Sequence, residues 1–339
     1  MIVIFSTSRR VLCGLPIFAL AAVALGGLRA VPRPTKQVEY VITDTRIVAF
    51  DNSGNYQLQF GGTGTGNGLF QVPSGIAVDP GTNNVWVSDA VLNRVQEFSS
   101  TGTYIAQFGS TGTSAGQLLN PYGLAVDGSG NVWVADTGNN RIQEFSSSGA
   151  FVQTFGSLGG GNGQFVGPVG LACFNTNGSG PCNALDVSDT GNNRIQQFTL
   201  NTSPPTFAAT FGAPGIGTGQ FRGPFAVATE SVLVFVADPY NQRVQMFFNS
   251  PGSLVNGVWI TSSGLYPTSY VFTYPSPYGV AVDGNGLVWT TDYNANKVVA
   301  FGNNLALPIL VGPFGVTGGG PGQLYHPTYI AIGAIPVNG

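Results

Sequence analysis

The stretch PYGLAVDGSGNVWVADTGNNRIQEF, residues 121–145, decides the fold. Its three apolar segments are separated by Asp, Gly and Asn, which is typical of strands joined by tight turns. A near copy occupies residues 73–98, and looser copies begin at Pro168, Pro224 and Pro277. The anchor prolines at 73, 121, 168, 224, 277 and 327 are 48, 47, 56, 53 and 50 residues apart. This period, with several short strands per unit, predicts a β-propeller with one blade per repeat.

Each unit holds four candidate strands, which in the second unit are residues 123–126, 132–135, 141–145 and 151–155. Near the N-terminus, residues 40–50 match the second and third strands of a unit, and residues 56–61 match its fourth. The missing first strand lies at the far end, at residues 327–332. The sequence therefore predicts an all-β domain over residues 38–339 with six four-stranded blades, closed by a blade that both termini share.

The recurring phrase joins Pro-x-Gly-[Ile/Leu/Val]-Ala-Val-Asp, Val-Trp-Val-x-Asp and Asn-x-Arg-[Val/Ile]-Gln-x-Phe. In this it closely resembles the NHL-repeat family, here in an exported, bacterial form. The resemblance covers roughly residues 38–335 and implies a six-bladed propeller. The later units depart from the pattern: Phe174 and Glu230 replace the first-strand Asp, Ala226 replaces Gly, and Lys297 replaces Arg.

The N-terminus has the layout of an export signal. Arg9 and Arg10 precede an apolar run over residues 11–28, and Ala30 offers a small residue for cleavage. Residues 1–30 are interpreted as this signal and 31–37 as a linker, which predicts a periplasmic or extracellular protein. An uncleaved membrane anchor is the alternative. The choice between general and twin-arginine export stays open.

The cysteines agree with export. Cys173 ends the first strand of its unit and Cys182 precedes the next strand, across a loop longer than its counterparts. A disulfide across the neck of that hairpin is geometrically natural in an oxidising compartment.

The charge balance argues against a nucleic-acid partner. Of 12 Lys and Arg, the export segment takes Arg9, Arg10 and Arg29, so 12 − 3 = 9 basic residues face 15 acidic ones, a net charge of −6. No basic patch is left to neutralise phosphates.

The most regular charges are the acidic residues that end the second strands, each followed by a basic residue. The sequence predicts that they form structural ion pairs that join adjacent strands, rather than a cation site. The predicted pairs are Asp44 with Arg46, Asp89 with Arg94, Asp136 with Arg141, Asp189 with Arg194, Asp238 with Arg243, and Asp292 with Lys297.

A second acidic set lies at the other end of the innermost strands: Asp79, Asp127, Glu230 and Asp283. These residues fit the start of hairpin turns, and they are also weak candidates for binding Ca²⁺, which favours several oxygen ligands. No cofactor is otherwise expected. The single histidine, His326, cannot build a histidine metal site, and loop packing is the better interpretation.

Aromatic residues are the best candidates for binding. Tyr122, Phe225 and Tyr278 follow the anchor proline in three units, where the chain enters the innermost strand. The stretch 259–278 breaks the usual linker and adds further rings, of which Tyr266 and Tyr274 are binding candidates. Amphipathic rings at this face suit a sugar or a peptide, although they also fit simple loop filling.

The sequence thus predicts a non-catalytic binding or scaffold module for a protein, peptide or glycan ligand on the linker side of the ring. The membrane is a partner only if the N-terminal segment is uncleaved. The alternative is a hydrolase or lyase that uses a divalent metal in the central channel.

Overall fold

The computed structural model describes residues 37–176, 182–230, 233–248, 259–261, 276–302 and 310–334. The predicted export signal and the linker up to residue 36 lie outside these ranges, as do Tyr266 and Tyr274. Within them, none of the helices is long and apolar enough to cross a bilayer.

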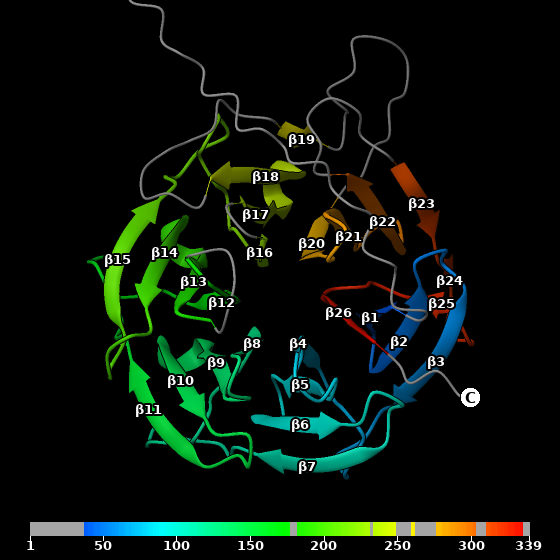
Figure 1. Cartoon of the computed structure of the whole chain (residues 1–339), viewed down its shortest axis with the longest axis horizontal. Helices are drawn as coiled ribbons and strands as arrows, with labels where there is room; N and C mark the ends of the chain where they lie inside the picture. Colours follow the sequence, from blue (N-terminus) through cyan, green and yellow to red (C-terminus); the bar gives the residue numbers. More distant parts are fainter. Residues whose placement is uncertain are drawn as a thin grey trace, which may run out of the picture. The chain divides into compact units, whose positions relative to one another are not determined.

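Six four-stranded antiparallel sheets form the blades of a ring (Figure 1). Blade 1 consists of β4 (Pro73–Val78), β5 (Val85–Asp89), β6 (Arg94–Phe98) and β7 (Tyr104–Phe108). Blade 2 consists of β8 (Leu124–Val126), β9 (Val132–Asp136), β10 (Arg141–Phe145) and β11 (Phe151–Phe155). Blade 3 consists of β12 (Pro168–Phe174), β13 (Ala184–Asp189), β14 (Arg194–Thr199) and β15 (Thr206–Phe211).

Blade 4 consists of β16 (Val227–Glu230), β17 (Leu233–Asp238), β18 (Arg243–Phe248) and β19 (Trp259–Thr261). Blade 5 consists of β20 (Pro277–Val282), β21 (Leu287–Asp292), β22 (Lys297–Gly302) and β23 (Leu310–Phe314). The short helices η1 (Thr137–Asn139), η2 (Thr190–Asn192) and η3 (Pro239–Asn241) follow the second strands of blades 2 to 4. A small parallel pair, β24 (Val316–Thr317) and β25 (Gln323–Leu324), lies in the linker that leads to blade 6.

Blade 6 contains the seam of the ring. Its strand order is β26 (Ile330–Ala334), β1 (Gln37–Thr43), β2 (Arg46–Asp51) and β3 (Tyr56–Gly61). The C-terminal strand β26 pairs antiparallel with β1, with Tyr40 opposite Ala331. The innermost strands contact one another in the cycle β4, β8, β12, β16, β20, β26 and back to β4. The predicted six-bladed ring, with one blade shared by both ends of the chain, is therefore confirmed.

The core lies between neighbouring blades. Trp86, Trp133 and Trp289 on the second strands are almost fully buried. Trp133 packs with Leu185 and Val187 of the following blade. Small residues are needed nearer the axis, where a Cβ at Gly123 would collide with the backbone carbonyl oxygen of Val169. Large side chains outside and small ones inside give each blade the wedge shape that a ring requires.

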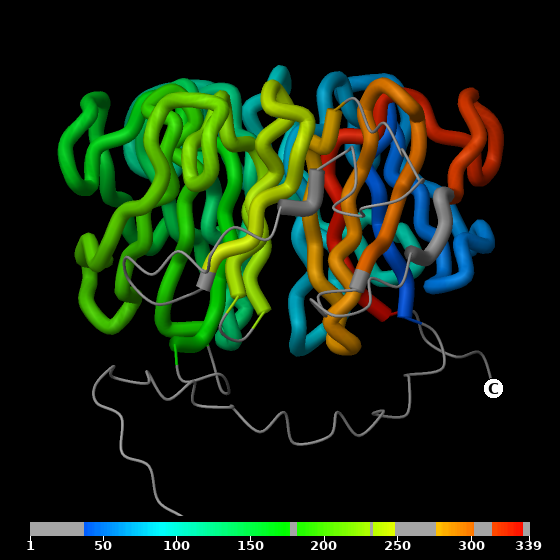
Figure 2. Tube along the Cα trace, turned by 90° about the horizontal axis from the view of Figure 1, so that it is seen from above, coloured from blue at the N-terminus to red at the C-terminus, as the bar shows by residue number. Residues whose placement is uncertain are grey.

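The ring has two faces, seen edge-on in Figure 2. We call the end where the second strands finish and the Gly-rich linkers enter the innermost strands the linker face. We call the opposite end, where hairpins join the first and second strands, the hairpin face. The candidate sites divide between these two faces.

Candidate functional site

In blades 1 to 4, the Asp that ends the second strand accepts a backbone N–H of the linker that enters the blade. Asp136, at the end of β9, is 0 % exposed and accepts a hydrogen bond from the backbone N–H of Leu119 at 2.7 Å. It also binds Arg141 Nε at 2.7 Å and Gln143 Nε2 at 2.9 Å. The rest of the Arg141 guanidinium donates to backbone carbonyls at residues 113, 114 and 117 of the linker. The carboxylate and the guanidinium together fix a loop that has few side chains of its own.

The same ion pair forms in blades 3 and 4, at 2.8 Å between Arg194 and Asp189 and at 3.0 Å between Arg243 and Asp238. In blade 1, Asp89 and Arg94 are opposite one another in the strand register but bond to different groups. The carboxylate of Asp89 accepts backbone N–H groups at residues 71, 72, 91 and 92. Arg94 donates instead to Gln107 and to the carbonyls of residues 66 and 69.

Blades 5 and 6 depart further from the predicted pattern. Asp292 lies opposite Lys297 in the register, and burial raises the pKa of its carboxyl although Lys297 acts in the other direction. In blade 6, Asp44 pairs with Arg46 at 3.1 Å, but it sits in the turn. The residue opposite Arg46 is Thr43. Its hydroxyl donates to the carbonyl oxygen of Tyr325 and accepts the N–H of the same residue, so it binds the linker backbone as the buried carboxylates do in the other blades.

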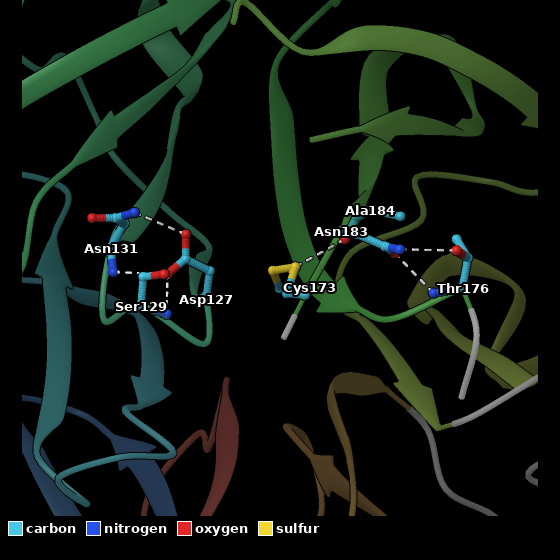
Figure 3. The surroundings of a disulfide bond; sticks show 8 residues. Asp127, Ser129, Asn131, Cys173, Thr176, Asn183 and Ala184 are labelled. Atoms are coloured by element: carbon cyan, nitrogen blue, oxygen red, sulfur yellow. Dashed lines mark hydrogen bonds between the residues drawn. A yellow bond between two sulfur atoms is a disulfide. The ribbon is translucent and has the colours of Figure 1, made fainter. Parts of the chain in front are cut away.

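The acidic residues at the hairpin face start turns. Asp79 accepts Gly81 N at 2.7 Å, and Asp127 accepts Ser129 N at 2.8 Å and Asn131 N at 3.0 Å (Figure 3). Asp283 accepts backbone N–H groups at residues 285 and 287 in the same way, and Glu230 ends β16. In the part of the chain that the structure describes, no three His, Cys, Asp or Glu residues lie close enough together to hold one metal ion.

A disulfide joins Cys173 to Cys182 at the neck of the first hairpin of blade 3 (Figure 3). The two Cα atoms are 5.7 Å apart. Asn183 supports the same neck, because its side chain accepts Thr176 N at 2.9 Å and donates to the Thr176 hydroxyl at 3.1 Å. The bond therefore closes a short loop at the hairpin face.

Two carboxyl groups that the sequence pattern did not single out are buried in the hairpin-face half of the ring. Asp186 takes the register position that Trp133 holds in blade 2, and burial raises its pKa to about 7. Glu39 on β1 is 0 % exposed. Burial is the larger cause and the nearby charge of Asp283 the smaller one that raise the pKa of the Glu39 carboxyl to about 8. Both acidic residues stand at second-strand positions where the repeat has an apolar residue, and this difference is the sequence signal that could have identified them.

The structure brings the three predicted aromatic side chains together near the axis at the linker face. Tyr122 and Phe225 meet edge to face at 6.0 Å between ring centroids, and Phe225 and Tyr278 meet at 4.9 Å. Tyr329 of blade 6, at a position that holds glycine in most other blades, packs against Phe225 at 5.4 Å. Tyr122 and Phe225 are half-buried and also pack against the core, so they are not free surface rings.

More aromatic residues extend this group outward over blades 4 to 6. Tyr293 contacts Tyr278 at 5.0 Å and stacks on His326 at 4.4 Å with an interplanar angle of 7°. Tyr325 packs against His326, and Tyr240 hydrogen-bonds to Tyr278. We call the set the aromatic patch; its members are Tyr122, Phe225, Tyr240, Tyr278, Tyr293, Tyr325, His326 and Tyr329.

The outer members of the aromatic patch are accessible. Tyr240 is 63 % exposed and Tyr325 is 47 % exposed. Toward the axis the side chains of the patch are less exposed to solvent, and this burial raises the pKa of Tyr122, Tyr278 and Tyr329. The Tyr329 hydroxyl is buried with no hydrogen-bond partner. The patch therefore offers exposed ring faces around a polar but uncharged centre.

Charges are segregated between the two faces. Nine acidic residues lie toward the hairpin face: Glu39, Asp51, Asp79, Glu97, Asp127, Glu144, Asp186, Glu230 and Asp283. In the described ranges every basic residue lies at the linker face: Arg46, Arg94, Arg141, Arg194, Arg222, Arg243 and Lys297. The remaining six acids also lie there, so among the described residues the linker face has nearly balanced acidic and basic groups, whereas the hairpin face has acidic groups only.

Residues 118–145, which make up most of blade 2, match the NHL repeat family. The chain carries an NHL repeat. The propeller is similar to a chain of a nidogen/laminin complex at 16 % identity and a TM-score of 0.61, over 88 % of this chain and 98 % of that one. It is also similar to a Bacteroides caccae protein of unknown function, at 11 % identity and a TM-score of 0.56, over 88 % and 99 % of the two chains.

A third similar structure is virginiamycin B lyase from Staphylococcus aureus, at 15 % identity and a TM-score of 0.50, over 76 % of this chain and 73 % of that one. At these identities the likeness shows the fold alone. Among curated proteins, no sequence matches the chain.

Proposed function

We propose that this NHL propeller is a non-catalytic binding module that takes a protein or peptide ligand on the aromatic patch of its linker face. The observation that carries the proposal is the exposure of Tyr240 and Tyr325 beside rings held in fixed contact by three blades. Tyrosine rings that are already ordered bury much area at little cost in conformational entropy, and they are enriched at protein interfaces.

The charge distribution supports this choice of face. The ion pairs of the linker face are already largely buried, with carboxylates that are 0 % exposed, so a ligand that covers this face removes little further water from them. A protein assembly also provides one of the similar folds, a chain of the nidogen/laminin complex. That likeness supports a binding role in general and does not identify a partner.

The test is retention of the full chain on peptide and glycan arrays. Replacing Tyr240, Tyr293 and Tyr325 together with Ala should abolish peptide retention and leave the melting temperature within a few degrees, because these rings lie outside the inter-blade core. The control carries Ala at Ile105 and Val152, which are similarly exposed on outer strands. Binding that survives the triple variant, or that occurs only on glycans, would contradict the proposed ligand class.

A further inference from the structure

One charged side chain at the linker face departs from the repeat. Arg222 stands two residues before the anchor proline of blade 4, where the other described linkers have uncharged residues. These are Gln71, Leu119, Val166 and Tyr325. The backbone N–H of Arg222 donates to the buried carboxylate of Asp238 at 2.9 Å, and its side chain is exposed. The linker backbone is therefore held as in blades 1 to 3, and only the side chain differs.

No acidic side chain of the protein pairs with the Arg222 guanidinium. All 15 acidic residues lie in the described ranges, and none of them forms an ion pair with Arg222. In those ranges every other arginine donates to a carboxylate or to linker carbonyl oxygens: Arg46, Arg94, Arg141, Arg194 and Arg243. Arg222 makes no such contact within the described part of the chain, which leaves its N–H donors for a ligand.

Arg222 adjoins the aromatic patch. The next residue, Gly223, lies so close to the ring of Tyr240 that an added Cβ would be 2.8 Å from the Cδ2 atom of that ring. The side chains of Arg222 and Tyr240 are both exposed, and Tyr240 hydrogen-bonds to Tyr278. A carboxylate paired with Arg222 therefore places the neighbouring residues of its own chain within reach of these two rings.

The distribution of charge favours this position for an anion. Among the described residues the hairpin face has acidic groups only, so it repels an anionic ligand. The other arginines of the linker face are already engaged with carboxylates or carbonyl oxygens. The tyrosine hydroxyls beside Arg222 are neutral donors, which add hydrogen bonds to an anion without repelling it.

We propose that the peptide bound by the aromatic patch carries a carboxylate that pairs with Arg222. This carboxylate comes from an Asp or Glu side chain or from the C-terminus of the peptide. The planar guanidinium binds it through two parallel hydrogen bonds, and the adjacent rings shield the pair from water. A single arginine among neutral groups suits a monoanion, whereas phosphate groups are typically bound by clusters of arginines. The inference rests on the proposed function and adds the charge of the ligand to it.

Matched peptides on an array test this pairing in the full chain. One set is amidated at the C-terminus and carries a single Asp or Glu beside Tyr, Phe or Pro, and its partner set carries Asn or Gln instead. A third set has no acidic side chain and ends in a free carboxylate. The wild type should retain at least one carboxylate set about tenfold more strongly than the amide set, and added salt should reduce this preference.

Two variants separate the local charge from the total charge. Arg222→Gln should abolish the preference and keep the weaker retention of the amide set, because the rings are unchanged. Its Tm should match that of the wild type, since the Arg222 side chain is exposed. Ser147→Asp is the control, because it lowers the net charge by the same amount in an exposed turn at the hairpin face, and it should keep the preference.

The outcomes distinguish this inference from the proposed function. Equal retention of carboxylate and amide peptides by the wild type would overturn the pairing with Arg222 and leave the proposed function standing. A preference that survives in Arg222→Gln would do the same. If no peptide is retained, or if the triple variant at Tyr240, Tyr293 and Tyr325 binds as the wild type does, the proposed function fails and the inference fails with it.

Discussion

Asp186 places a carboxyl group where blades 1, 2 and 5 place the indole rings of Trp86, Trp133 and Trp289. The side chain is fully buried, and Gln197 Nε2 donates to its Oδ1 at 3.2 Å while Oδ2 has no partner. An ionised carboxylate in this position loses its hydration without a strong replacement, whereas the protonated form loses much less.

This position predicts that stability falls as pH rises. The pKa of Asp186 is raised from 3.8 to about 7 in the folded state, so its contribution is fully present below about pH 4 and is lost as pH approaches 7. Asp186→Asn should remove this part of the pH dependence and be more stable than the wild type at pH 8, by a few kcal/mol. Chemical denaturation of both proteins from pH 4 to pH 8 measures the difference. Parallel curves would contradict the prediction.

Arg141 is the opposite case, because removing its charge leaves the buried carboxylate of Asp136 without its cationic partner. Arg141→Ala should destabilise the fold by about 2 kcal/mol, because Asp136 stays buried and the 111–118 linker loses three carbonyl contacts. Arg222→Ala is the matched control, since Arg222 is exposed at the same face and should change stability by less than about 0.5 kcal/mol. Urea midpoints decide, and equal midpoints for the two variants would show that the linker does not need its arginine.

At the scale of elements, the first hairpin of blade 3 combines a disulfide with a side-chain clamp. Intact-mass measurement before and after reduction should show a gain of about two hydrogens. Because the bond spans only nine residues, replacing both cysteines with Ser should cost about 2–3 kcal/mol, the low end for disulfides. Free thiols in protein recovered without reductant would refute the bond and weaken the argument for export.

The repeat predicted the strands well because each strand is bounded by Gly, Asp or Asn in a fixed order. In blade 2 the observed strands match the predicted ones to within a residue at each end. The alignment failed at Asp44, because blade 6 joins its second and third strands through a two-residue turn where blade 2 has four residues. The residue opposite Arg46 is therefore Thr43 and not Asp44.

The candidate site was predicted only in part. Tyr122, Phe225 and Tyr278 could be chosen because they share one place in the repeat. Tyr240 and Tyr293 could not be chosen from the sequence, since their place in the aromatic patch depends on contacts that form only when the blades are assembled in the ring. Glu39 was hidden for a similar reason: only the closed ring brings it to Asp283.

At the scale of the whole molecule, the ring depends on one pairing, that of β26 with β1. A chain that ends at Pro327 should lose this strand, expose the edges of β1 and of the neighbouring inner strands, and aggregate with a markedly lower Tm. A chain that ends at Ala334 keeps β26 and serves as the control. If the shorter chain melts like the full-length protein, the seam is not where the topology places it.

The seam also imposes an order on biosynthesis. Strand β1 leaves the ribosome nearly 300 residues before β26, the strand that completes its sheet. While the five intervening blades are made, β1 keeps a free row of backbone N–H and C=O groups, and no local partner can take them up. The native ring is therefore unavailable during synthesis, whatever the stability of the individual blades. Closure of the ring is therefore the last step of folding, and it can begin only when β26 has emerged.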